Sequence, residues 1–276
     1  MTSDSDPGAQ TTVSLYADDT SSVTASDTWE NVERGMTKVA TNLENYSRAN
    51  GLCLNVGKTQ TLNLGGSKET TTATLKILGV EVEKSVGFSS HHTTMLADLR
   101  RRVGIVRRMA TKLSRGRLLS EIARALVVGK VQCNAWVTRR VRLSPEQPRN
   151  GDDVATQRTM TELARTLIGA RRADRLRVQD LADRAALPTL NEIVTRQAAI
   201  AAWKSVKGGA LHDLLQLYDD RTRGHLRNLR RPLSHRCIAA SNMADVWNAS
   251  EHLRSATTLT QAKTAAKKFA TTVRHI

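Results

Sequence analysis

The feature that most constrains this chain is a segment, residues 96–149, that is both strongly basic and strongly periodic. It contains 14 basic and 3 acidic side chains, whereas residues 1–95 contain 7 basic and 11 acidic ones. Apolar residues recur in it every three or four positions, which predicts two long amphipathic helices whose opposite faces carry most of the arginines. The apolar positions are Leu96, Leu99, Val103, Val106, Met109 and Leu113 in the first helix, and Leu119, Ile122, Leu126 and Cys133 in the second, from Leu118 to Val137.

The charge of the whole chain predicts a polyanionic partner. Its 276 residues include 42 Lys and Arg against 26 Asp and Glu, a net charge of +16, with only 3% aromatic residues. Because a guanidinium group can bind two phosphate oxygens at once, arginine-rich helices suit contact with nucleic acid. A solvated basic face, or attraction to acidic protein or anionic lipid, is the alternative. The arginines expected to contact nucleic acid are Arg100, Arg101, Arg102, Arg107, Arg108, Arg115 and Arg117.

Composition also excludes several classes of protein. No apolar run approaches the roughly 20 residues of a membrane span. The first ten residues are polar and acidic, so we expect no secretory signal and an intracellular protein, nuclear or cytoplasmic. The three cysteines, Cys53, Cys133 and Cys237, lie far apart, and the histidines lack ligand spacing, which disfavours a disulfide scaffold or a zinc site.

The first part of the chain predicts a small α+β region behind a disordered tail, residues 1–12. Two strand-like pieces, 13–16 and 21–25, flank two adjacent acids and predict a hairpin. Asp27 and Glu30 fit a capping box that starts a helix, which Asn50-Gly51 ends. A core-facing stripe is expected along that helix at Trp29, Val32, Met36, Val39, Leu43 and Tyr46.

Further strands are expected at 52–56, 61–64 and 75–82, the last bent at Gly79. Two prolines and a glycine make residues 144–153 the best linker. Beyond it the patterns are helical, at about 155–172, 177–185, 189–207, 210–219, 242–255 and 260–274. The predicted fold class is therefore α+β and mostly helical.

Several ordered motifs carry a resemblance to a known family. Residues 15–20 (Leu-Tyr-Ala-Asp-Asp-Thr), residues 50–59 (Asn-Gly-Leu-Cys-Leu-Asn-Val-Gly-Lys-Thr) and residues 77–80 (Ile-Leu-Gly-Val) follow one another in the chain. They resemble the catalytic hairpin and later palm motifs of reverse transcriptases of non-LTR (LINE-type) retrotransposons, across residues 13–140. Two departures are Gly57, where Pro or Ser is usual, and Phe88, where Trp is commoner.

The resemblance implies domains and residue roles. Residues 13–90 would be a partial polymerase palm, 91–143 an arginine-rich helical thumb and 154–276 a helical C-terminal region. Asp18 and Asp19 would be catalytic ligands of Mg²⁺ in a two-ion site, and Lys58 would stabilise or protonate the leaving pyrophosphate. Tyr16 would lie near the primer terminus, and Gly79 in the primer-grip hairpin. The partners implied are an RNA template and the backbone of an RNA–DNA or DNA duplex.

The same resemblance predicts an incomplete enzyme. The family supplies a further metal-binding aspartate and the fingers from a region upstream of the hairpin, and only 15 residues precede Tyr16 here. We therefore expect the C-terminal part of an RNA-directed DNA polymerase, a nucleotidyltransferase of a transposable element, without activity by itself. The alternatives are a non-catalytic basic helical nucleic-acid-binding protein derived from such an element, and a decayed copy with no selected function.

Overall fold

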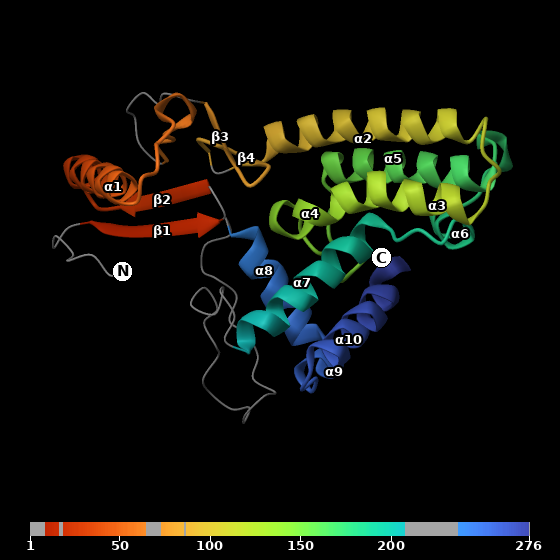
Figure 1. Ribbon diagram of the computed structural model, residues 1–276. Helices are drawn as coiled ribbons and strands as arrows, with labels where there is room; N and C mark the ends of the chain where they lie inside the picture. The colour runs from red at the N-terminus through yellow and green to blue at the C-terminus, as the bar shows by residue number, and fades with distance from the viewer. Residues whose placement is uncertain (1–8, 17–18, 65–72, 86, 208–236, 276) are drawn as a thin grey trace. The chain divides into compact units, whose positions relative to one another are not determined.

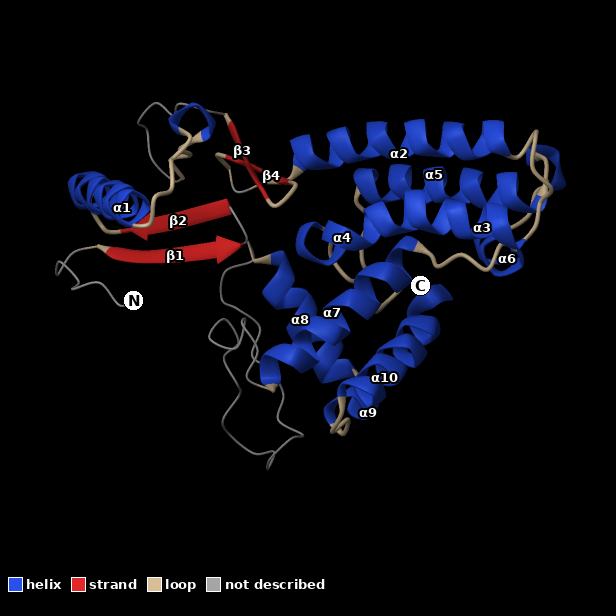
Figure 2. Cartoon of the chain, in the orientation of Figure 1, coloured by secondary structure: helices blue, strands red, loops and turns tan. Residues whose placement is uncertain are grey.

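The protein is described here from a computed structural model that covers residues 9–16, 19–64, 73–85, 87–207 and 237–275. The chain divides into two compact units, residues 1–85 and 86–276. Both strand pairs lie in the first unit and most of the helices in the second (Figure 2). The α+β class with a predominance of helix is therefore confirmed.

The N-terminal unit begins with the predicted hairpin. Strands β1 (Gln10–Tyr16) and β2 (Asp19–Ala25) pair antiparallel, with Tyr16 opposite Asp19. Strand β1 starts earlier than expected, so the predicted disordered tail is wrong from Gln10 onward, and its first eight residues lie outside the described ranges. The added strand residues pair in register with the end of β2, which satisfies their backbone groups.

Helix α1 (Trp29–Ala49) follows the hairpin. Its cap is Thr28, whose hydroxyl accepts a hydrogen bond from the Asn31 amide at 3.4 Å, one residue after the expected Asp27. The predicted stop is confirmed, because Gly51 has φ +68°, a left-handed conformation that glycine adopts without strain.

A glycine lets α1 lie close to the hairpin. A Cβ atom placed on Gly35 would meet the Thr24 Cγ2 atom of β2 at 2.8 Å. Thr24 is opposite Thr11 in the register, and their hydroxyls are 3.1 Å apart. The face of the hairpin that carries these two threonines is therefore the face that α1 covers.

The second half of this unit differs from the prediction. The expected strands at 52–56 and 61–64 are wrong: residues 52–64 hold only a 3-10 turn, Val56–Lys58, closed by a hydrogen bond from the Lys58 amide to the Asn55 carbonyl at 3.0 Å. The single strand expected at 75–82 is a hairpin of β3 (Thr74–Ile77) and β4 (Val80–Glu83). Leu78 and Gly79 both have positive φ, at 46° and 83°, which reverses the chain.

The N-terminal unit buries little. Among its described residues only Ser47 is fully buried. The apolar stripe of α1 is half-buried, and Tyr46 at its end is 55% exposed. The expectation that this stripe forms a core face is therefore met only in part.

The C-terminal unit is helical in its described residues (Figure 1). The predicted second amphipathic helix is present with a π-helical segment, Arg124–Val128, between its two halves, and the helix expected at 210–219 lies outside the described ranges. The helices are α2 (Ser89–Met109), α3 (Arg117–Ala123), α4 (Gly129–Thr138), α5 (Gly151–Ile168), α6 (Val178–Arg184), α7 (Leu190–Val206), α8 (Ile238–Ala249), α9 (Glu251–Arg254) and α10 (Leu259–Thr272). Single-turn 3-10 helices lie at Arg172–Asp174 and Val273–His275.

One hydrophobic core joins these helices. Leu99 of α2, Leu163 of α5 and Trp247 of α8 belong to the same buried cluster. Helix α2 packs along α5, and α7 packs against α4, α8 and α10 (Figure 1). The segments predicted as thumb and as C-terminal region therefore share a core. Of the predicted linker, residues 144–150 form a loop inside this unit, and residues 151–153 are instead the first turn of α5.

That loop is held by specific hydrogen bonds. The Arg142 guanidinium donates to the carbonyls of Gln147 and Pro145 at 2.9 and 3.1 Å. The Gln147 side-chain oxygen accepts from the Leu143 amide at 2.7 Å.

None of the helices in the described ranges has both the length and the apolar character that crossing a membrane requires.

Candidate nucleic-acid interface

The predicted metal hairpin is only partly described. Asp19 opens β2 with an exposed side chain, and Tyr16 ends β1, while Asp18 lies outside the described residues. Within the described ranges no three His, Cys, Asp or Glu side chains gather as a metal site would require, a statement that does not extend to Asp18. The residues proposed for Mg²⁺ therefore stay a prediction.

The other two predicted residues of the N-terminal unit lie at turns. Lys58 ends the 3-10 turn and is exposed. Gly79 lies in the β3–β4 turn in a left-handed conformation. Both positions are exposed, and the roles expected for them stay a prediction.

Several predicted arginines are engaged within the protein. Arg102 donates to Asp98 at 2.8 Å and to the carbonyl of Leu126 in the π-helical segment at 3.1 Å. Arg101 contacts the same carboxylate at 2.9 Å. Burial pushes the pKa of Asp98 upward, but the hydrogen bonds from Arg102 and Arg101 outweigh it, so the pKa lies below its usual value. Arg117 pairs with Glu121 at 2.7 Å.

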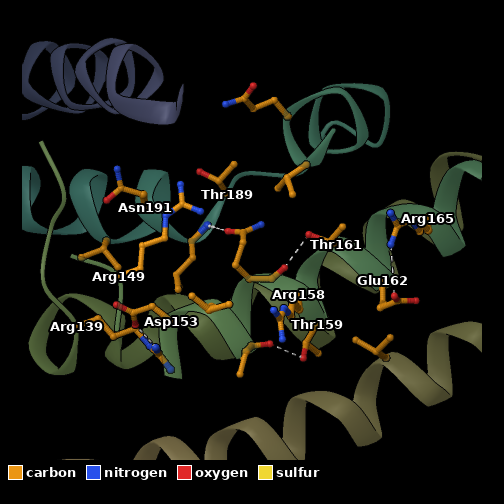
Figure 3. A pocket seen from close by; sticks show the side chains of 18 of the residues that line it. Arg139, Arg149, Asp153, Arg158, Thr159, Thr161, Glu162, Arg165, Thr189 and Asn191 are labelled. Carbon is orange, nitrogen blue, oxygen red and sulfur yellow. Dashed lines mark hydrogen bonds and ion pairs between the residues drawn. The ribbon is translucent and has the colours of Figure 1, made fainter. Parts of the chain in front are cut away.

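A larger concentration of arginine lies in an open groove of about 980 Å³ in the C-terminal unit. Helices α2 and α5 and the starts of α6 and α7 line it. Figure 3 shows Arg158, Glu162 and Arg165 along α5, with Arg149, Thr189 and Asn191 beside it. We call this surface the arginine groove. Its acidic side chains are Asp153 and Glu162, and its arginines are Arg100, Arg107, Arg139, Arg140, Arg142, Arg149, Arg158, Arg165, Arg172 and Arg274.

Two regular rows of arginine run through the groove. Arg100 and Arg107 are seven residues apart on α2, and Arg158 and Arg165 are seven apart on α5. Seven helical residues rise about 10.5 Å. That distance is close to the advance of three nucleotides along one strand, at about 3.4 Å each.

The two helices that carry these rows run parallel. Near their starts the His92 Nδ1 atom is 3.2 Å from the Asp152 carboxylate, and further along Arg107 is 3.7 Å from Glu162. The two pairs of arginines therefore follow one another in the same direction on neighbouring helices, Arg100 and then Arg107 on α2, and Arg158 and then Arg165 on α5.

Other groove arginines stabilise its walls. Arg139 is buried, forms an ion pair with Asp153 and donates to Thr156 at 2.9 Å. Arg274 pairs with Asp183 and Glu192. Burial, and then the charge of Arg149, lower the pKa of Arg142. These arginines position the groove more than they offer charge to a ligand.

Two exposed groove arginines make no ion pair within the part of the chain that the structure describes. Arg100 and Arg158 are exposed, and neither has a hydrogen-bond or ion-pair partner among the described residues. A cation without a protein partner gives up no intramolecular contact when it binds phosphate. Arg100 and Arg158 are therefore the groove residues best suited to contact a nucleic-acid backbone.

A buried histidine of α2 contacts the first turn of α5. His92 contacts Asp152, and its pKa is lowered first by burial and then by the charge of Arg139, with Asp152 opposing both. Its Nε2 atom is buried without a hydrogen-bond partner among the described residues. The lowered pKa favours the neutral form of His92 at pH 7, and its contact with Asp152 joins α2 to the start of α5.

The groove includes only part of the predicted arginine set. Arg100 and Arg107 line it, and Arg115 lines an adjoining hollow. Arg101, Arg102, Arg108 and Arg117 line neither. Arg158 and Arg165 could have been found from the sequence, because they are seven residues apart on α5, as Arg100 and Arg107 are on α2. The arginines that sequence reasoning did not assign to the site are Arg139, Arg140, Arg142, Arg149, Arg158, Arg165, Arg172 and Arg274.

Comparison with known proteins adds no relative to this description. The chain matches no protein-family model, no curated protein and no solved structure.

Proposed function

We propose that this chain derives from the reverse transcriptase of a non-LTR retrotransposon and that its C-terminal unit binds the backbone of an RNA–DNA or DNA duplex. The observation that carries the binding proposal is the arginine groove, where ten arginines and two carboxylates line one surface. Contacts to phosphate fix the position of a duplex without reading its sequence. We therefore expect binding that is sequence-independent and strongly salt-dependent.

The order of elements supports the ancestry. A two-stranded hairpin that contains Asp19 comes first, then helix α1, then the β3–β4 hairpin with Gly79, then the arginine-bearing helices. This is the order in which the catalytic hairpin, palm helix, primer-grip hairpin and thumb follow one another in the family that the motifs resemble.

The proposed roles in the N-terminal unit follow the motifs. Asp18 and Asp19 would hold Mg²⁺, which in two-ion sites activates the attacking hydroxyl and stabilises the leaving group. Lys58 would donate a proton to the leaving pyrophosphate, and Tyr16 would contact the primer end. Because the family uses a further aspartate, this chain by itself is proposed to bind duplex without extending a primer.

A second candidate is a nucleic-acid-binding protein that has no catalytic role. The arginine groove favours it, because every residue that lines the groove belongs to the C-terminal unit. Binding by that unit needs none of the carboxylates of the first hairpin.

One pair of measurements tests these proposals. Primer extension on an RNA template with Mg²⁺ is expected to give no product, while a duplex of the same sequence binds at low salt. Robust extension that disappears in Asp18→Ala would show that the chain is a complete enzyme and contradict the proposed inactivity. Failure to bind any duplex at low salt would contradict the proposed function of the groove.

A further inference from the structure

We infer that a hollow at one end of the arginine groove binds a phosphate monoester, the terminal phosphate of a nucleic-acid strand. The inference rests on the proposed function, because it assigns a ligand to part of the same surface. We call this site the Glu162 hollow. Its volume is about 230 Å³, and its charged residues are Arg107, Arg115, Glu162, Arg165 and Arg172.

Three of the arginines surround one carboxylate. Arg172 donates to Glu162 Oε1 from Nη2 at 2.9 Å and from Nε at 3.2 Å. Arg165 lies 3.5 Å from the same oxygen, and Arg107 lies 3.7 Å from the other oxygen. A single negative charge therefore faces three positive ones, and only Arg172 makes close hydrogen bonds to it.

The arginines have donors to spare. A guanidinium group carries five N–H donors, and Arg107 and Arg165 each make one long contact to Glu162. The Arg165 Nε atom is buried and has no hydrogen-bond partner among the described residues. A buried donor without a partner costs free energy. The Arg107 side chain is 63% exposed, so its remaining donors can reach an anion in the hollow.

The fourth arginine is placed by a glycine. A Cβ atom added to Gly169, which has φ +74° at the end of α5, would meet the Arg115 side chain at 3.2–3.4 Å. Arg115 is exposed and has no ion-pair partner in the described part of the chain. Because residue 169 is a glycine, the Arg115 guanidinium can lie close to the end of α5. No carboxylate among the described residues competes with an anion for it.

The charge of the hollow selects the ligand class. Four arginines and one glutamate leave an excess of positive charge, which suits a dianion better than the single charge of a phosphodiester. A phosphate monoester carries about −1.5 to −2 charges at pH 7 and three strong acceptor oxygens. The hollow has room for such a group with ordered water, since one water occupies about 30 Å³.

The position of the hollow identifies the source of the phosphate. Arg107, Glu162, Arg165 and Arg172 line both the hollow and the arginine groove, so the two are continuous. A strand that follows the arginine rows along α2 and α5 would end at the hollow. Its terminal phosphate would then set how far the duplex extends into the groove.

The test compares duplexes that differ only at one strand end, using the full chain. A 5′-phosphorylated or 3′-phosphorylated duplex is expected to bind about tenfold more tightly than the same duplex with hydroxyl ends, the value of one charge-assisted hydrogen bond. In Arg115→Gln the two duplexes should bind with nearly equal affinity. The matched control, Arg158→Gln, should weaken both duplexes equally and leave the ratio unchanged.

Thermal unfolding with inorganic phosphate provides the second readout. Phosphate is expected to raise the unfolding temperature of the wild-type chain and of Arg158→Gln, but not of Arg115→Gln. Equal binding of phosphorylated and hydroxyl-ended duplexes would overturn the inference and leave the proposed function standing. Stabilisation by phosphate without any duplex binding would overturn both the strand-end assignment and the proposed function.

Discussion

The two units of this protein differ most in how they bury apolar side chains. In the C-terminal unit, many apolar side chains between Met95 and Val273 are buried, and those of Trp247 and Leu99 are almost completely enclosed. In the N-terminal unit, only Ser47 is fully buried among the described residues. Its large apolar side chains that are exposed are Val13, Leu15, Val23, Tyr46, Leu52, Leu54, Leu64 and Leu78.

This difference in burial predicts that the C-terminal unit is the more stable of the two. Burial of a large apolar side chain contributes about 1.5–3 kcal/mol, and the C-terminal unit buries many. A two-stranded hairpin by itself is marginal in water and gains stability by packing against a helix, but the contact of α1 with the first hairpin buries few apolar side chains. The N-terminal unit is therefore expected to exchange its amide hydrogens far faster than α5 and α7.

The largest expected effect comes from truncating one aromatic residue in each unit. Trp247→Ala removes a side chain that is 1% exposed and should lower the free energy of unfolding of the C-terminal unit by about 3–5 kcal/mol. Tyr46→Ala should change the stability by less than about 0.5 kcal/mol, since that side chain is 55% exposed. Urea unfolding followed by circular dichroism measures both. Equal losses would mean that the two units are equally well packed.

Acid should distinguish the units next. All histidines lie beyond residue 90, and the pKa of His92 is lowered by burial and by Arg139. As the pH falls below 6.5, His92 takes up a proton in the unfolded chain before it does so in the folded chain. The free energy of unfolding therefore decreases as the pH decreases. The loss is at most about 1.4 kcal/mol per pH unit. His92→Gln should flatten this dependence between pH 7 and 5. An unchanged profile would show that neither burial nor the charge of Arg139 lowers the pKa of His92 in the folded chain.

A smaller effect should stabilise the N-terminal unit. Leu78 has φ +46° in the β3–β4 turn, a conformation that costs a non-glycine residue about 1–3 kcal/mol. Leu78→Asn creates the Asn-Gly pair that such turns favour and should add about 0.5–1 kcal/mol. Slower amide exchange in β3 and β4 would report it. A variant Gly79→Ala, which adds strain at φ +83°, should do the opposite.

The smallest expected effect concerns binding. Lys58→Ala should change duplex affinity by less than about 1 kcal/mol, because Lys58 belongs to the N-terminal unit and the groove lies in the other. Fluorescence anisotropy with a labelled duplex measures it. In a full-length relative the matching change should slow nucleotide addition by ~10² to 10⁴. Collapse of binding with unchanged chemistry would make Lys58 a phosphate anchor.

Local patterns account for most of what the sequence predicted correctly. The first hairpin, the helix that ends at Asn50-Gly51 and the amphipathic period of α2 all follow from residues within one element. The start of that helix, α1, was predicted one residue early, at Asp27, because Asp and Thr both cap helices and the structure uses Thr28.

The arginine groove was only partly predictable because it depends on tertiary packing. Its arginines extend from Arg100 to Arg274 and come from several helices. Counting charge does not distinguish Arg139, which is buried against Asp153, from Arg158, which is exposed. The proposed metal pair remains a sequence prediction, since Asp18 lies outside the described residues.

The salt dependence of duplex binding tests the central claim most directly. With roughly five phosphate contacts, the slope of log affinity against log salt should be about −4 to −5. The double variant Arg100→Gln/Arg158→Gln should make the slope less negative by about 2, because each phosphate contact contributes about 0.9. The control, Arg184→Gln/Arg196→Gln, removes two exposed arginines outside the groove and should leave the slope unchanged. Equal slopes for the two double variants would contradict the assignment of binding to the arginine groove.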